Sequence, residues 1–140
     1  MIEYKTGTDV IDWESLVQLY YETDLVVGLG RRKDLEKIKK SFLNTYKVVT
    51  AWDGDRIVGA CRMISDGECY GWIHDVGVLP EMQKKGIGKK LMEELMKGNE
   101  SLLFGLTSSF VAEEFYQKIG FKKHKTAMGK YPGNSTYLED

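Results

Sequence analysis

The stretch that decides the fold is residues 75–96, DVGVLPEMQKKGIGKKLMEELM. It opens with an apolar run that closes at Pro80, a residue that cannot continue a β-ladder. After two glycines set among lysines, apolar residues recur at helical spacing. We therefore predict a strand that ends before Pro80 and a helix over residues 86–97, with Gly98 as its stop. The apolar stripe of this helix consists of Ile87, Leu91 and Leu95.

The turn between this strand and this helix has two interpretations. It is either a glycine hinge beside a solvated basic face, or a cradle for phosphate. A helix amino terminus presents unpaired N–H groups and the positive end of its dipole, and glycine at 86 and 88 lets an anion approach the backbone. The combination suits a pyrophosphate. A Rossmann fingerprint would need a third glycine where Leu91 stands, and no stretch has the P-loop spacing.

Working outward, the period of the apolar residues changes along the chain. Helical spacing predicts helices over residues 12–22 and 33–43, after a possible first strand. Alternation and Asp-Gly turns predict a three-stranded antiparallel meander. Short strands and helices are expected over the rest of the chain. The expected later elements are strands over 46–52, 56–64 and 69–79, a strand over 101–107, a helix over 111–120 and a final strand or two over 121–131. The layout is α+β with one βαβ crossover from 72 to 107.

Composition limits the function classes. The chain has 140 residues and a net charge of −1, so no overall basic field indicates nucleic acid. Neither a membrane-length apolar run nor a signal peptide is expected, and no linker divides the chain. Cys61 and Cys69 lack CxxC spacing, which argues against a zinc site or a disulfide framework. We expect one domain over residues 1–140, in the cytoplasm, with no bound metal.

The opening stretch resembles the signature of the GNAT superfamily of N-acetyltransferases. The matching residues are Val78, Pro80, Gln83, Gly86 and Gly88, and FYQKIGF at 115–121 resembles the family's Tyr-x-x-x-Gly-Phe segment. The resemblance covers nearly the whole chain, with motif-level specificity over residues 72–121. It implies a three-layer α+β fold: a mixed, mostly antiparallel sheet of about six or seven strands flanked by about four helices.

The resemblance implies acetyl-CoA as cosubstrate. Its pantetheine arm would lie along the strand near Val76 and Val78, where the fourth and fifth strands of the family separate, and Gly77 is compatible with either a bulge or close packing there. Ser109 stands where many members carry an asparagine that contacts the cofactor. The pyrophosphate would bind the stretch formed by Gln83, Lys84, Gly86, Ile87, Gly88 and Lys89.

Tyr116 matches the family tyrosine that protonates the departing sulfur, and an amide near Val76 would stabilise the oxyanion. The general base stays open between His74, Asp75 and a water relay. Arylalkylamine-type members carry a histidine at the position of His74, but their companion histidine is Trp72 here. Strict alternation along a strand predicts that His74 and Asp75 cannot both face the acceptor.

The acceptor is expected to be a small primary amine. The family's acceptor region would place Tyr20, Leu29, Trp72 and Met128 in an apolar wall, with Glu22 and Asp24 to attract a cation. Three alternatives stay open: a protein acetyltransferase acting on lysine or an N-terminal amine, an acyl-CoA-binding module without turnover, and nucleotide binding without CoA. A homodimer is possible, and no nucleic-acid or membrane partner is expected.

Overall fold

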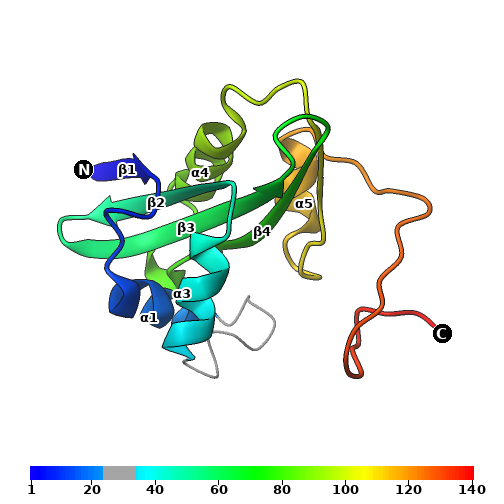
Figure 1. Cartoon of the computed structure of the whole chain (residues 1–140), viewed down its shortest axis with the longest axis horizontal. Coiled ribbons are helices and arrows are strands. Elements are labelled where there is room, and N and C mark those ends of the chain that lie inside the picture. Colours follow the sequence, from blue (N-terminus) through cyan, green and yellow to red (C-terminus); the bar gives the residue numbers. More distant parts are fainter. Residues whose placement is uncertain (24–33) are drawn as a thin grey trace.

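The computed structural model describes residues 1–23 and 34–140, and these form one sheet in the order β1–β2–β3–β4–β5 (Figure 1). Neighbouring strands are antiparallel except β4 and β5, which run parallel because α4 connects them. The mixed, mostly antiparallel sheet with one crossover is thereby confirmed. The strands are β1 (Ile2–Thr6), β2 (Lys47–Asp53), β3 (Arg56–Ser65), β4 (Tyr70–Val78) and β5 (Leu103–Leu106).

Helices cover both faces of the sheet, which confirms the three-layer α+β architecture. In Figure 1, α1 and α3 lie on one side and α4 on the other. The Asp34 carboxylate caps α3 by accepting the Lys37 N–H at 3.1 Å. In the described ranges, none of the helices has the length and hydrophobicity that a membrane crossing requires. The elements are α1 (Trp13–Thr23), α3 (Leu35–Leu43), the 3-10 turn η1 (Pro80–Met82), α4 (Ile87–Met96) and α5 (Glu113–Lys118).

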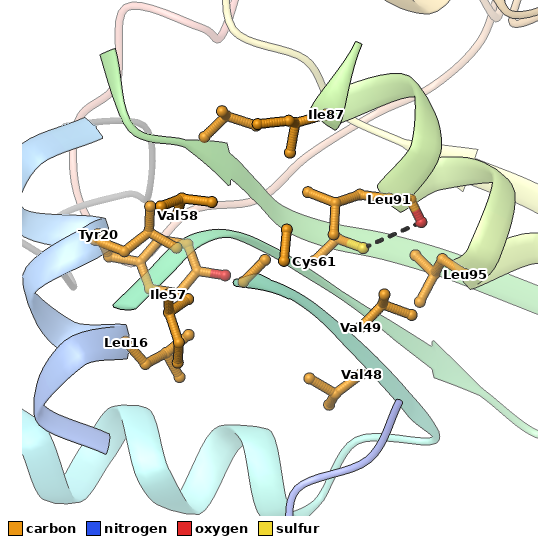
Figure 2. Close-up of a cluster of buried hydrophobic side chains, with 14 of the residues drawn as sticks. Leu16, Tyr20, Val48, Val49, Ile57, Val58, Cys61, Ile87, Leu91 and Leu95 are labelled. Atoms are coloured by element: carbon orange, nitrogen blue, oxygen red, sulfur yellow. Dashed lines mark hydrogen bonds between the residues drawn. The ribbon is translucent and has the colours of Figure 1, made fainter. Parts of the chain in front are cut away.

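The core lies on both sides of β2 and β3, which explains why these strands are apolar without alternation. Figure 2 shows Leu16 of α1 beside Ile57, and Cys61 directed at α4. The Cys61 thiol is buried, and its sulfur lies 3.7 Å from the Leu91 carbonyl oxygen, whereas Cys69 is free and exposed. The buried strand β3 therefore supports β4 along one side.

The predicted final strands over residues 121–131 are wrong. This stretch forms no strand in the structure, and residues 122–130 are all exposed. Its lysines leave it without an alternating apolar face, so it gains little by lying on a core. The sheet of the described residues consequently has five strands rather than six or seven.

Candidate active site

A β-bulge interrupts β4 at its centre. His74 pairs with Arg62 of β3 and Gly77 pairs with Ala60, so two residues, Asp75 and Val76, lie opposite one. Asp75 has a φ of 57°, a left-handed value that is uncommon outside glycine. The irregularity therefore lies just before Gly77.

Gly77 itself serves close packing. A Cβ added at Gly77 would lie 3.3 Å from Cε1 of Tyr20, so the glycine admits the tyrosine ring. The Tyr20 hydroxyl in turn donates a 2.6 Å hydrogen bond to the Asp75 carbonyl. Tyr20 thus holds the bulge from the α1 side.

Just before the bulge, β4 and β5 separate, as the family resemblance implies. Their pairing ends at Ile73 and Leu106, while β4 continues to Val78. The Leu79 N–H bonds the Val58 carbonyl on the β3 side. Because successive residues of a strand direct their backbone groups to opposite sides, Val76 and Val78 present theirs toward the gap.

The gap contains a cavity of about 70 Å³. It is where the structure brings together Asp75, Val76, Ser109 and Tyr116, four of the site residues that sequence reasoning selected. His74 does not line it. The lining residues come from β4, the end of β5 and the segment that leads into α5: Ile73, Asp75, Val76, Leu106, Thr107, Ser109, Ala112 and Tyr116.

Tyr116 is a buried side chain in this cavity. Its ring packs edge-on against Phe115 and Phe121, with centroids 5.0 and 5.9 Å away. Burial, and secondarily the nearby Cys61, raise the pKa of Tyr116 to about 12. Among the described residues its hydroxyl has no hydrogen-bond partner, so the phenol keeps its proton and can donate it to a guest in the cavity.

Ser109 supplies the test of whether a cosubstrate fits. Within the described chain, its Oγ is the one buried side-chain oxygen or nitrogen without a hydrogen-bond partner. Leaving such a group unpaired costs about 1–3 kcal/mol, so a polar ligand group there would be stabilising. Ser109 is one of the lining residues of the cavity, and an unpaired hydroxyl there is compatible with the amide-bearing arm of acetyl-CoA.

The amino terminus of α4 has backbone N–H groups that lie outside its hydrogen-bond ladder. Gly86 caps it with a φ of 83°, and Lys84 also has a positive φ of 64°. The first intrahelical bond runs from the Lys90 N–H to the Gly86 carbonyl, so the N–H groups of Ile87, Gly88 and Lys89 precede the helical ladder. Lys84 and Lys89 are exposed beside them.

Three of the predicted cofactor residues also have structural roles. The Gln83 N–H bonds the Pro80 carbonyl, and its side-chain amide donates to the Val78 carbonyl at 3.0 Å. The Ile87 side chain is buried in the core, so only its backbone is available to an anion. A Cβ added at Gly88 would lie 3.2 Å from Cζ of Phe115, so this glycine sets the approach of α5 to α4.

Strict alternation does not describe His74 and Asp75. The Asp75 carboxylate forms a 2.7 Å ion pair with Nε of Arg62, the strand partner of His74. Arg62 also donates to the Ser41 carbonyl at 3.4 Å and to the Thr45 hydroxyl at 3.1 Å. The positive φ of Asp75 lets its carboxylate reach Arg62, the strand partner of His74, although Asp75 lines the cavity and His74 does not.

Arg62 is the important residue that sequence reasoning missed. It is a charged side chain within an otherwise apolar run between Cys61 and Met63, and that mismatch is the signal that could have found it. With only 12% of each side chain exposed, Arg62 and Asp75 form a largely desolvated pair. Asp75 therefore already has a partner for its negative charge.

Unlike the Asp75 carboxylate, the His74 imidazole forms no ion pair with another described residue. Burial is the main cause that lowers its pKa, the positive charge of Arg62 lowers it further, and Asp75 opposes both. The ring is consequently neutral at pH 7 and able to accept a proton. No group of three or more potential metal ligands occurs in the described residues.

The expected acceptor wall is only partly present. The placement of Tyr20 in it is wrong, because 1% of this side chain is exposed. Trp72 lies over Gly105, where an added Cβ would collide with the indole, and Met128 is 98% exposed on the C-terminal segment. Glu22 lies 3.7 Å from Arg56. Asp24 and Leu29 lie outside the described residues.

Comparison with known proteins decides the family. The model described as an acetyltransferase (GNAT) domain matches residues 44–123, more than half of the chain. The protein belongs to the GNAT acetyltransferase family. This GNAT protein is 30% identical, over 122 residues, to an uncharacterised ycf52-like N-acetyltransferase of Prochlorococcus marinus, a match that covers 81% of this chain and 62% of that protein. It spans between 44% and 66% of the length of the curated relatives it matches.

Solved structures share the fold. A GNAT-family acetyltransferase from Streptococcus pneumoniae superimposes with a TM-score of 0.76 at 23% identity, covering 95% of this chain and all of that one. An N-acetyltransferase from Thermoplasma acidophilum, solved in complex with coenzyme A, gives a TM-score of 0.71 at 20% identity, covering 91% of this chain and 93% of that one.

Proposed function

We propose that residues 1–140 act as one catalytic domain, an N-acetyltransferase that transfers the acetyl group of acetyl-CoA to the primary amine of a small molecule. The observation that carries the proposal is the cavity between β4 and β5. It combines a protonated Tyr116 and an unpaired, buried Ser109 with strand backbone groups that no neighbouring strand uses.

The chain offers a binding partner for each part of the cosubstrate. Acetyl-CoA supplies an activated thioester, whose carbonyl carbon bonds to the amine nitrogen as the carbon–sulfur bond breaks. Val76 and Val78 offer strand backbone to the pantetheine amides, in the manner of an added strand. The α4 amino terminus, with Lys84 and Lys89, offers N–H groups and positive charge to the pyrophosphate.

Tyr116 donates its hydroxyl proton toward the departing sulfur. A pKa of about 12 means that the phenol is protonated throughout the neutral range. A free thiol has a pKa near 8.5, so complete transfer from the phenol alone is uphill, and the proton released by the attacking amine completes the balance. Tyr116 therefore acts mainly as a hydrogen-bond donor to the developing thiolate.

His74 is the better of the two protein candidates for the base. Alkyl ammonium groups lose their proton near pH 10, so the amine needs an acceptor at neutral pH. The pKa of His74 lies below its usual value, which leaves a neutral ring, whereas the Asp75 carboxylate is bound to Arg62. Because His74 lies outside the cavity lining, a water molecule would relay the proton.

A small amine with an apolar or aromatic part suits the open face beside His74. Trp72, two residues before His74 on β4, is 39% exposed, and Tyr70 is 58% exposed. Alternation from Tyr70 to His74 puts all three side chains on one face of the strand. These rings offer contact area to an acceptor of that kind.

The experiment measures thiol release from acetyl-CoA with aromatic amines, polyamines, amino sugars and lysine peptides. We expect one small-amine class to respond. Tyr116→Phe should lower kcat about 100-fold and leave the Kd for CoA within about twofold, as for loss of a general acid. Tyr46→Phe, at an exposed tyrosine outside the cavity lining, is the matched control.

Four other outcomes would each change the proposed function. A response to lysine peptides alone would replace the small-molecule acceptor by a protein. CoA binding without thiol release from any acceptor would favour a binding module, and binding of ATP in place of CoA would overturn the cofactor assignment. Equal turnover by Tyr116→Phe and the parent would remove the role of Tyr116.

A further inference from the structure

The Tyr20 hydroxyl lies in the core between α1 and the sheet, and Figure 2 shows its ring among the buried side chains. Only 1% of the side chain is exposed, and the centroid of its ring is 5.8 Å from that of Phe42. Burial is the main cause that raises the pKa of Tyr20 well above its ordinary value, so the phenol keeps its proton in the neutral range. The hydroxyl is therefore a permanent donor, and the Asp75 carbonyl accepts its hydrogen bond at 2.6 Å.

The Asp75 carbonyl and the Val76 N–H belong to the same peptide unit. In a trans peptide these two groups point in opposite directions, and the described residues contain no cis peptide bond. A hydrogen bond that holds the carbonyl toward α1 therefore holds the N–H away from α1. Val76 lines the cavity between β4 and β5, whereas Tyr20 does not. The Tyr20 hydroxyl thus fixes the direction of an amide that belongs to the cavity, although it lies outside the cavity itself.

The backbone at Asp75 needs such support. Its φ of 57° is a left-handed value, which residues other than glycine keep only where the surrounding structure imposes it. Two side chains impose it here, since Arg62 holds the Asp75 carboxylate at 2.7 Å and Tyr20 holds the Asp75 carbonyl. Of these two, only Tyr20 acts on the peptide that carries the Val76 N–H.

An amide of fixed direction has a use in acetyl transfer. As the amine nitrogen bonds to the thioester carbon, negative charge gathers on the acetyl oxygen. This charge returns to the carbon–oxygen bond when the carbon–sulfur bond breaks and its electron pair leaves with sulfur. An N–H that is already directed at the oxygen lowers the barrier, because it does not have to reorient. A carbonyl that accepts a hydrogen bond also polarises its peptide, which makes the N–H of that peptide a better donor.

We propose that Tyr20 is a positioning residue for acetyl transfer, acting through the Asp75–Val76 peptide to hold the Val76 N–H toward the acetyl oxygen. This role rests on the proposed function, and it differs from the place in the acceptor wall that the sequence suggested for Tyr20. The Val76 N–H meets a charge that develops only in the transition state. Loss of the Tyr20 hydroxyl should therefore slow the chemical step and leave the binding of both substrates unchanged.

Steady-state kinetics of Tyr20→Phe is the first test, because this change removes the hydroxyl and keeps the ring. We expect kcat with the responding amine to fall at least about tenfold, while KM for the amine and the Kd for CoA stay within about twofold. Tyr46→Phe is the matched control, since it removes a hydroxyl that bonds Asn99 at 3.2 Å, and it should keep the parent kcat. Leu95→Ala, at a buried position near the carboxyl end of α4, controls for lost stability. It should lower the melting temperature and leave kcat unchanged well below that temperature.

Gly77→Ala disturbs the same contact by another route. An added Cβ would lie 3.3 Å from Cε1 of Tyr20 and press on the ring that carries the hydroxyl. If both changes act through the one hydrogen bond, kcat of the double variant Y20F/G77A should be close to that of Tyr20→Phe. Losses that multiply would contradict action through this contact. Should Tyr20→Phe fail to fold, Gly77→Ala alone provides the kinetic test, with the same expected fall in kcat at constant KM.

Nuclear magnetic resonance of the free chain tests the contact without turnover. Tyr20→Phe should shift the carbonyl carbon of Asp75 and the amide of Val76, two signals of one peptide, whereas Tyr46→Phe should leave both in place. Unchanged signals would overturn the proposal, and so would a Tyr20→Phe variant that is as fast as the parent or loses CoA affinity as much as kcat. A parent chain without turnover on any amine would overturn the proposed function, and shifted signals would then show that Tyr20 has a structural role only.

Discussion

At the scale of single residues, the bulge depends on a small polar network. Tyr20 holds the Asp75 carbonyl and Arg62 holds the Asp75 carboxylate, so both ends of the residue with the positive φ are fixed. The Arg62 guanidinium also lies 5.3 Å from the centroid of the Phe42 ring. These contacts determine where Val76 meets the cavity, although neither Tyr20 nor Arg62 lines it.

Replacing Arg62 by methionine should destabilise the fold strongly. The change leaves the Asp75 carboxylate without a partner in a largely buried position, which costs about 3–5 kcal/mol. The double variant R62M/D75N removes both charges, so its free energy of unfolding should fall less than that of the single variant. Arg56→Met is the matched control, because Arg56 is 54% exposed and its ion pairs are worth at most about 1 kcal/mol. Urea unfolding of the three variants provides the measurement.

His74 should make stability depend on pH on the acid side. Its pKa in the folded protein lies below 6.5, the ordinary value, so the unfolded chain binds the proton more readily. The stabilisation from the neutral ring is complete above pH 6.5 and is lost as the pH falls through the folded-state pKa. Urea unfolding between pH 7.5 and 4.5 should therefore show a smaller decline for His74→Gln than for the parent. The same dependence of stability on pH in both proteins would show that His74 does not contribute to it.

At the scale of elements, the amino terminus of α4 packs against α5, and in the proposed function it also binds the pyrophosphate. Gly86 is needed for its φ of 83°, and nothing lies within 4 Å of a Cβ built there. Gly88 is needed for a different reason, since Phe115 of α5 packs on it. The position of α5, and with it Tyr116, therefore depends on a glycine in α4.

Gly88→Ala should disturb activity more than stability. Alanine is a better helix former by about 1 kcal/mol, which offsets part of the contact with Phe115. The shift of α5 should lower kcat for acetyl transfer at least roughly tenfold, because small displacements of a proton donor are costly. Phe115→Leu lacks the two ring atoms nearest to Gly88, Cζ and Cε1. The double variant G88A/F115L should therefore recover activity, and failure of this rescue would contradict the packing argument.

Sequence reasoning found the elements but not the irregularities within them. The helices have their own apolar period and stop signals, such as Gly98 with its φ of 82°, and Asp-Gly turns separate the strands of the meander. Gly77 left a bulge and close packing both open, because the bulge at Asp75 and Val76 is decided by pairing with β3. The ion pair of Arg62 with Asp75 joins residues 13 positions apart, and spacing alone does not reveal such a partner.

At the scale of the whole molecule, the two edges of the sheet differ. β1 ends one edge as a regular strand paired over five residues, whereas β5 pairs over four and then separates to form the cavity. The separation that creates the candidate active site also leaves β5 weakly supported on its inner side. Among the described residues, β5 therefore has an open edge on its outer side and a gap beyond Ile73 on its inner side.

Amide exchange should detect this difference between the edge and the centre of the sheet. Alternation directs the N–H groups of Phe104 and Leu106 away from β4, so they should exchange faster than the central amides of β2 and β3, which are paired on both sides. Mass spectrometry of exchange makes the comparison. Equal protection at Phe104 and at the centre of β3 would contradict an open outer edge of β5.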